Sequence, residues 1–513
     1  MQPQTSQATS PSPTAATIQR VVDVVGASAR LVTHILGNVE RLVGDLVQDS
    51  TAVARESEEL YAAASEAAQS VSATVRAAPR FWRVVQELVR LVASYRLHQI
   101  RARGLSLAVA ERALQALHGR SAERLHDLCV ELRGGVLKVG QFVSSRVDLL
   151  PDPYVTSLSR LQDQVPPVPV EQIVARIEQE LGAPLERLFE QFDAEPLAAA
   201  SLAQVHGAVV GGEAVAVKVQ VPEIERTVEI DLAALKVIAG LVQDLLLPHL
   251  DLRCVAVELE RSILKELDYE REARVAGELG QQFEAEPRVR VPRIYPELSS
   301  RRVLTMERIA GQRLVPFLDR CEVAQEQAGM DRLFETLLRT TCAQVLQHGL
   351  FQADCHPGNF LVVDGDEGPV LALLDFGAVT RFPGELRLAY GRLAGAILAR
   401  DNQQVAERLA GLGFRTRGDE ATLVRFADML MDVFRPDPGV SLAELDPRAA
   451  FEEALALARA NPVHVPQDFV LLGRVFATLG GLLLRYRPRI NLFALLAPYL
   501  APVLATAVAP DPQ

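Results

Sequence analysis

Two acidic residues and one amide stand at the two ends of a predicted β-hairpin. Asp354 and Asn359 precede one apolar run, Asp375 follows a second, and a polar turn at 364–369 separates the runs. Because the outer ends of a hairpin lie side by side, we expect the three side chains to be neighbours. Phosphoryl transfer uses such a set, since one carboxylate orients the attacking hydroxyl while an amide and a second carboxylate hold Mg²⁺ on the phosphates.

The spacing of these residues favours the same interpretation. Asp354 and Asn359 have the separation of the aspartate and asparagine in the kinase catalytic loop, and Asp375 opens an Asp-Phe-Gly triplet. Each motif alone is weak, because short triplets recur by chance and His-Pro-Gly-Asn could be an ordinary turn. Together they predict Asp354 as the base or water-orienting group, and Asn359 and Asp375 as the Mg²⁺ ligands.

A second predicted hairpin lies upstream and turns at Gly211-Gly212. Its second strand reads Val-Ala-Val-Lys, ending at Lys218, as in the kinase strand whose lysine binds the α- and β-phosphates. The alternative for Lys218 is an exposed strand lysine. An alanine-rich loop precedes the hairpin and is expected to cover the phosphates; it comprises Ala198, Ala199, Ala200 and Ser201.

The lysine needs an acidic partner from a neighbouring helix. A helix is expected from Asp251 to about Gln282, and its periodicity leaves three candidate acids open, which are Glu266, Asp268 and Glu272. Further on, 291–309 predicts two strands that end near Glu307, where backbone groups could bind an adenine. Upstream, a helix is expected over 170–192, after a proline-rich linker at 151–169.

Length and composition limit the possible classes of protein. A chain of 513 residues with 49% hydrophobic residues predicts two or three globular domains. A net charge of −12 argues against nucleic acid as the main partner. The five cysteines form no Cys-x-x-Cys pair, which indicates a reducing compartment with neither a zinc site nor disulfides.

The N-terminal part reads as helices after a Ser-, Thr- and Pro-rich tail at 1–17. The stretch from Phe81 to Leu97 has interleaved arginines. It could pack on the main domain, pack on a second copy in a homodimer, or lie on an anionic membrane. A helical stretch from 105 to 150 follows, with a break or close contact expected at Gly134-Gly135. The uncharged run at 491–510 is interpreted as a core helix and tail rather than a membrane span.

With both halves described, the chain resembles the UbiB/AarF family of atypical kinase-like proteins from about Leu105 to Leu500. The resemblance rests on Lys138-x-Gly-Gln141, the alanine-rich stretch to His206, Glu266-x-Asp268 and the run Ala353 to Asn359. It implies that Glu272 pairs with Lys218. It also implies that Lys138 and Gln141 fold back over the active site beside Glu266 and Asp268. Two positions depart from the family pattern: Gln352 replaces the usual His, and Gly207 replaces a common basic residue.

The resemblance implies an α+β, bilobal, atypical kinase-like fold with a helical N-terminal extension and a mostly helical C-lobe. The expected parts are a tail (1–17), a helical extension (18–104), a helical segment over the active site (105–165), an N-lobe (166–310), a C-lobe (311–500) and a tail (501–513). ATP and Mg²⁺ are the expected cofactors. The family implies a role in ubiquinone or other membrane-lipid metabolism, with an isoprenoid or lipid ligand. The expected location is the cytoplasm or the inner face of a membrane.

Two other classes of function remain open at this stage. One is a nucleotide-binding scaffold without turnover in a lipid-biosynthesis complex. The other is a conventional protein kinase, which the early Pro383-Gly384 disfavours because it leaves no room for a long activation segment.

Overall fold

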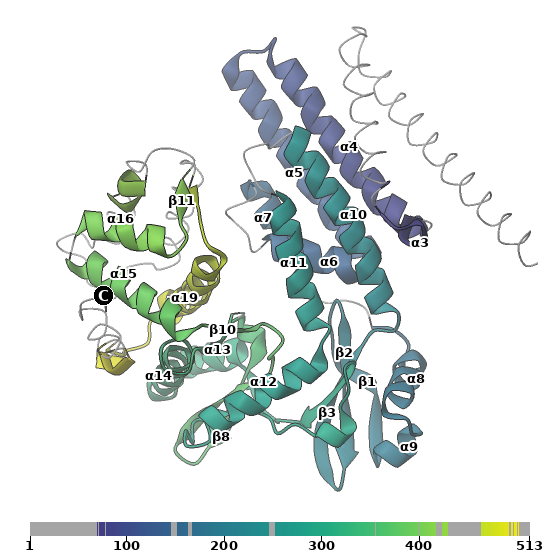
Figure 1. Cartoon of the computed structure of the whole chain (residues 1–513). Coiled ribbons are helices and arrows are strands. Elements are labelled where there is room, and N and C mark those ends of the chain that lie inside the picture. Colours follow the sequence, from purple (N-terminus) through teal and green to yellow (C-terminus); the bar gives the residue numbers. More distant parts are fainter. Residues whose placement is uncertain are drawn as a thin grey trace, which may run out of the picture. The chain divides into compact units, whose positions relative to one another are not determined.

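The computed structural model describes residues 71–76, 78–144, 151–162, 167–245, 252–353, 355–399, 401–416, 423–428 and 463–491, with single positions or short pieces at 69, 494–495, 497–499 and 501. Predictions on residues outside these ranges, including Asp354 and the helix expected before residue 69, are not addressed by it. The chain divides into two compact units (Figure 1). The first comprises Met1–Ser145, Pro151–Asp163 and Glu223–Arg261, and the second comprises Arg146–Leu150, Gln164–Pro222 and Ser262–Gln513.

The first unit is helical where it is described. Its elements are α3 (Ala73–Arg76), α4 (Pro79–Ala102), α5 (Leu107–Leu132), α6 (Gly134–Ser144), α7 (Asp152–Ser159), α10 (Ile224–Leu245) and most of α11 (Leu252–Glu266). Helix α4 packs against α5 and α10 (Figure 1). Its buried side chains recur at three- and four-residue steps, as expected of an amphipathic helix, and include Phe81, Val85 and Val92.

The break expected at Gly134-Gly135 is confirmed. Helix α5 ends at Leu132, and the corner to α6 has two residues in the left-handed region, Arg133 (φ 55°) and Gly134 (φ 58°). A Cβ atom at Gly135 would lie 2.7 Å from a carboxylate oxygen of Asp231 on α10. A glycine is therefore required where the backbone of α6 approaches α10.

The second unit contains an antiparallel sheet in the order β1-β2-β3-β5. Its strands are β1 (Gln191–Ala199), β2 (Ala203–Val210), β3 (Glu213–Gln220) and β5 (Val303–Glu307). The hairpin predicted at Gly211-Gly212 is confirmed, and both glycines have positive φ as a tight two-residue turn requires. Helix α8 (Val170–Leu181), followed by α9 (Leu185–Leu188), packs on the valine face of β3.

A second sheet has the order β4-β9-β8-β6 and contains the hairpin predicted around the acidic residues. Its strands are β4 (Val289–Arg290), β9 (Gly368–Leu373), β8 (Phe360–Gly365) and β6 (Gln312–Arg313). Strand β7 (Leu350–Gln352) pairs separately with β10 (Val379–Arg381). The surrounding elements include α12 (Tyr269–Gln282), α13 (Leu314–Ala324), α14 (Gln327–Cys342), a π-helix (Ala343–His348), α15 (Gly384–Ala399), α16 (Asn402–Gly411) and α19 (Gln467–Tyr486).

Several predicted boundaries are wrong. The helix expected over 170–192 ends at Leu181, because Gly182 adopts φ 70° and caps it, and β1 begins at Gln191. The single helix expected over 251–282 is two helices, because Asp268 starts α12 as its N-cap. The proline-rich linker contains α7, and α10 was not predicted. Only one of the two strands expected over 291–309 forms, β5, while Ile294 makes an isolated bridge.

One helix among the described residues, Asp468–Tyr486 in α19, is long and apolar enough to cross a membrane by length and composition. These criteria are weak, because a buried helix of a protein core also meets them. Val475 and Leu479 of this helix lie in the main hydrophobic core of the second unit. The run at 491–510 is mostly outside the described residues.

Candidate active site

Lys218 on β3 is the centre of the candidate site. Strand alternation places it on the face opposite Val217 and Val219, which are fully buried. Its Nζ lies 2.7 Å from Oε1 of Glu272 and 3.8 Å from Oδ1 of Asp375. The structure therefore brings together three of the residues that the sequence analysis selected from separate stretches of the chain.

The charges in this cluster support one another. Burial alone would lower the pKa of Lys218, but the carboxylates of Glu272 and Asp375 more than offset it, so its pKa is raised and the ammonium stays charged. The ammonium also lies over the ring of Tyr269, 5.0 Å from its centroid. Glu272 is 1% exposed. Burial raises the pKa of Glu272, and the Lys218 ammonium opposes that shift. The Oε2 atom of Glu272 makes no hydrogen bond to any residue that the structure describes.

Helix α12 positions Glu272, and Asp268 begins that helix. The Asp268 carboxylate accepts a hydrogen bond from the backbone N of Arg271 at 2.9 Å, which is the usual N-cap interaction. Glu266, two residues earlier, lies near the loop after Asp375, since a Cβ atom at Gly377 would be 3.8 Å from its Cγ. The gating roles proposed for Glu266 and Asp268 stay predictions.

The acidic end of the hairpin is assembled through the backbone. Asn359 ends a short 3₁₀ turn, Pro357–Asn359, and its carbonyl accepts a hydrogen bond from Leu374 N at 3.0 Å. Asp375 is the next residue, so Asn359 and Asp375 occupy the same end of the β8–β9 pair. One Asp375 oxygen, Oδ1, also accepts from Gly377 N at 3.0 Å.

Carboxylate and amide oxygens are suitable ligands for Mg²⁺, which typically takes one or two protein carboxylates and keeps phosphate and water ligands. The residues present fit that requirement. Among the described residues there is no group of three or more His, Cys, Asp or Glu side chains that could hold a metal ion by themselves. The donor set thus suits an ion that arrives with phosphates better than a permanently bound structural metal.

The alanine-rich segment lies at the end of β1. Ala198 and Ala199 are the last residues of that strand, whereas Ala200 and Ser201 lie in the connection to β2. Ala198 pairs with Val205, and Val205 pairs with Lys218 on β3. Ala198 is therefore two strands away from Lys218 in the same row, a separation of about 10 Å.

A buried polar chain supports this segment. His206, fully buried on β2, contacts Asp193 O through Nδ1 at 2.9 Å and the side chain of Gln204 through Nε2 at 3.2 Å. The Gln204 carbonyl accepts in turn from Val168 N. The carbonyl of Asp193 can only accept, so the network assigns the hydrogen of His206 to Nδ1. These bonds stabilise β1 where its pairing with β2 is irregular.

Three other predicted site residues, Glu307, Lys138 and Gln141, are not assigned a role at the site by the contacts that the structure describes. The Glu307 side chain is held by an ion pair with Arg290 and by Arg293 N at 3.2 Å, so an adenine contact there would fall to its backbone. Lys138 and Gln141 lie on α6 in the first unit, where Gln141 Nε2 donates to Leu161 O at 2.9 Å. Their proposed folding over the active site stays a prediction.

Two contacts at the site were missed. Arg271 donates to the carbonyls of Gly377 and Val379, at 3.1 and 2.6 Å. Gln352, noted only as a departure from the family pattern, is buried and donates to Asp375 O at 2.8 Å. No sequence signal identifies Arg271, because an arginine on a charged helix is usually exposed to solvent.

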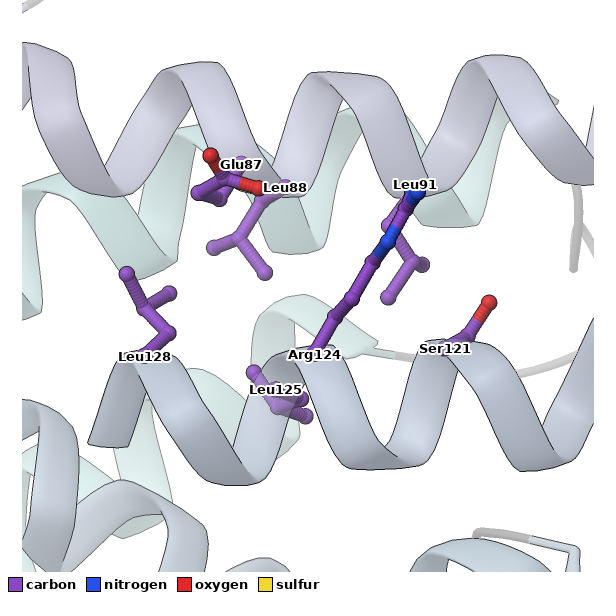
Figure 2. Close-up of a pocket in the computed structure, with 7 residues that line it drawn as sticks. All are labelled: Glu87, Leu88, Leu91, Ser121, Arg124, Leu125 and Leu128. Atoms are coloured by element: carbon purple, nitrogen blue, oxygen red, sulfur yellow. The ribbon is translucent and has the colours of Figure 1, made fainter. Parts of the chain in front are cut away.

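A small groove lies elsewhere, between α4 and α5 of the first unit (Figure 2). Leucines from both helices face one another across it, with Glu87 on one helix and Arg124 and Ser121 on the other. None of the predicted site residues lines it. The groove therefore plays no part in the candidate site.

Comparison with known proteins identifies the class to which this fold and site belong. Residues 160–409 match the model of the ABC1 atypical kinase-like domain. The probable protein kinase UbiB of Pseudomonas aeruginosa is 33% identical over 73% of this chain and 70% of its own length. An uncharacterised protein of Synechocystis is 32% identical over 74% of this chain and 67% of its own. The chain belongs to the ABC1/UbiB/aarF family of atypical kinase-like proteins.

The structural comparison agrees on the fold. The complex structure of Rv3197 with erythromycin, from Mycobacterium tuberculosis, matches with a TM-score of 0.50 and 24% identity. The match covers 76% of this chain and 98% of that one. The prediction of a mixed α+β, kinase-like protein with a helical N-terminal region is confirmed. The chain spans 56–67% of the length of three similar Synechocystis proteins.

Proposed function

We propose that the protein is an ATP- and Mg²⁺-dependent phosphotransferase or ATPase. The observation that carries the proposal is the partly buried ammonium of Lys218, placed between Glu272 and Asp375. Lys218 would bind the α- and β-phosphates, and Glu272 would keep its ammonium in place. Asn359 and Asp375 would hold Mg²⁺, which neutralises charge on the phosphates. Asp354 would orient the attacking hydroxyl or water.

A small molecule or water suits the site better than a protein as the phosphate acceptor. A peptide substrate needs a platform after the Asp-Phe-Gly triplet. Here β10 begins at Val379 and pairs with β7, and α15 begins at Gly384. The short connection leaves no length for such a platform, although similar proteins carry the name protein kinase.

We further propose a role in isoprenoid-quinone or other membrane-lipid metabolism, with the protein on the inner face of a membrane. The family resemblance supports the pathway. The tip between α4 and α5 supports the location, because it exposes Leu105, Leu107 and Val109, with exposed Arg101 and Arg103 beside them. Apolar side chains flanked by arginines suit the surface of an anionic bilayer.

The test compares ATP hydrolysis by the wild type with that of Asp375→Asn and Asp354→Asn, with neutral and with anionic vesicles. We expect hydrolysis by the wild type, stimulated by anionic vesicles, and its loss in both variants. ATP binding with equally negligible rates in all three proteins would reject turnover and leave a nucleotide-binding scaffold. Metabolite profiling of a deletion strain for quinones and polyprenyl intermediates would test the pathway.

A further inference from the structure

The loop that carries Asp375 is fastened to helix α12 by one side chain. The guanidinium of Arg271 donates to Gly377 O at 3.1 Å and to Val379 O at 2.6 Å. Both bonds are partly buried, and a charged donor makes them stronger than bonds between neutral groups. They add to the bond from Gln352 to Asp375 O and to one from Ala353 N to Ala378 O at 3.2 Å.

Arg271 precedes Glu272 on α12. Successive residues of an α-helix point about 100° apart, so the two side chains leave the helix in different directions. Glu272 reaches Lys218, whereas Arg271 reaches the loop after Asp375. A single helix, whose first turn is capped by Asp268, therefore holds both the phosphate-binding lysine and the proposed metal-binding loop.

The contact is transmitted to the carboxylate through Gly377. Its carbonyl accepts from Arg271, and its N–H donates to Oδ1 of Asp375 at 3.0 Å. A shift of Gly377 would therefore turn the Asp375 carboxylate. We propose that Arg271 is a positioning residue that orients Asp375 for Mg²⁺, without itself touching the nucleotide. The inference rests on the proposed function, since it assigns Asp375 to the metal.

The first test measures hydrogen exchange in the ligand-free protein, so it does not depend on activity. Arg271→Met is compared with Arg274→Met, which removes an exposed arginine three residues further along the same helix. We expect amide exchange in 376–380 to accelerate about tenfold in Arg271→Met, because two charge-assisted bonds are lost. Arg274→Met should match the wild type. Equal exchange in all three proteins would overturn the proposal.

The second test separates metal from nucleotide binding. Calorimetry would measure ATP binding in EDTA, followed by the Mg²⁺ concentration that half-saturates the ATP complex. For Arg271→Met we expect unchanged ATP binding in EDTA and a half-saturating Mg²⁺ concentration raised about tenfold. The rise should be smaller in Arg271→Lys, which keeps the positive charge on a single donor nitrogen. A parallel loss of ATP binding in EDTA would contradict it, since Arg271 would then support α12 as a whole. A wild type that binds no ATP would reject the proposed function, and hydrogen exchange alone would then decide the positioning role.

Discussion

Arg80 and Asp231 in the first unit, and Lys218 and Glu272 in the second, each pair a partly buried cation with a buried carboxylate, yet their hydrogen bonding differs. Arg80 meets both oxygens of Asp231, at 2.6 and 2.7 Å. Two further N–H groups of Arg80 reach the carbonyls of Leu132 and Arg133, at 2.8 and 3.0 Å. The second oxygen of Asp231 also accepts from Val136 N at 3.0 Å. Both side chains of this pair therefore also hydrogen-bond to the backbone at the corner between α5 and α6.

The pair at the candidate active site is less complete. Lys218 meets only one oxygen of Glu272, and among the described residues the other oxygen has no hydrogen-bond partner. A buried polar atom without a partner is costly, so each one calls for a physical explanation such as a catalytic or ligand-binding role. The difference between the pairs teaches that burial and charge do not by themselves identify a site. What separates the two pairs is the Glu272 oxygen that has no hydrogen-bond partner among the described residues.

The largest expected loss of stability follows from breaking the Arg80–Asp231 pair, in which both carboxylate oxygens are hydrogen-bonded. Arg80→Met leaves the buried Asp231 carboxylate without a counter-ion and should lower the free energy of unfolding by about 3–5 kcal/mol. Urea denaturation at pH 7 would measure it. Burial already raises the pKa of Asp231, so the deficit should shrink as the pH falls and the carboxyl takes up a proton.

Arg83→Met is the matched control for Arg80→Met. Arg83 lies on the same helix and pairs with Glu87 and Glu131, but its side chain is 38% exposed. Exposed pairs contribute about 0–1 kcal/mol. Similar losses of unfolding free energy for Arg80→Met and Arg83→Met would show that hydrogen bonding and burial of the partner carboxylate do not distinguish the two arginines.

The second prediction replaces the whole pair at the active site by apolar groups. Lys218→Met with Glu272→Leu removes a buried carboxylate and a partly buried ammonium, so the free energy of unfolding should stay level or rise by about 1–4 kcal/mol. ATP turnover should nevertheless disappear. The equivalent double replacement, Arg80→Met with Asp231→Leu, should remain unstable, because backbone groups of the α5–α6 corner would lose their partners. Equal denaturation midpoints for the two double variants would refute the distinction between the pairs.

The residues of the site were predictable to the extent that local patterns encode them. Lys218, Asn359 and Asp375 lie on or beside hairpins whose turns and alternation are visible in the sequence, and the structure brings Lys218 and Asp375 together. The Arg80–Asp231 pair was not predictable, because 151 positions separate its partners and no repeated pattern connects them. The buried acid of α10 was the available signal, since Asp231 interrupts an otherwise apolar helix face.

The errors in secondary structure share a physical cause. The helix expected over 170–192 has a continuous apolar pattern, but Gly182 ends α8 and the tertiary pairing of β1 with β2 overrides the later helical preference. Conversely, the break at Asp268 follows from local chemistry, because its carboxylate can cap the next helix. The motif spacing thus predicted which residues lie together more reliably than it predicted where helices and strands end.

The third prediction concerns Gly135, where the backbone of α6 lies close to Asp231 and Val228 on α10. An alanine at Gly135 would place its Cβ 2.7 Å from an Asp231 oxygen and 3.2 Å from the backbone of Val228. Gly135→Ala should therefore cost about 1–3 kcal/mol of unfolding free energy. Gly119→Ala, in the middle of α5 where nothing lies within 4 Å of the new Cβ, should instead gain about 0.5–1 kcal/mol. Thermal or urea unfolding would contradict this if both substitutions shifted stability in the same direction.

The smallest expected effect comes from the uncharged hydrogen-bond network of His206 with Gln204 and the Asp193 carbonyl. Burial lowers the pKa of His206, and its Nε2 accepts from Gln204 only while the ring is neutral. Below a pH of about 6.5 the unfolded chain takes up a proton at this histidine that the folded protein resists. The stability contribution of the neutral ring is thus present above that pH and is lost as the pH falls toward the lowered pKa. The loss should be at most about 1.4 kcal/mol per pH unit.

His206→Gln tests this last prediction. Unfolding free energies measured from pH 7.5 down to 5.5 should fall less steeply in the variant than in the wild type, even if the variant is less stable throughout. His118 and His348, whose pKa values burial also lowers, stay in both proteins, so their effect cancels in the difference of slopes. Parallel slopes would mean that His206 keeps an ordinary pKa in the folded protein. Burial and hydrogen bonding of the ring would then fail to hold His206 in its neutral form.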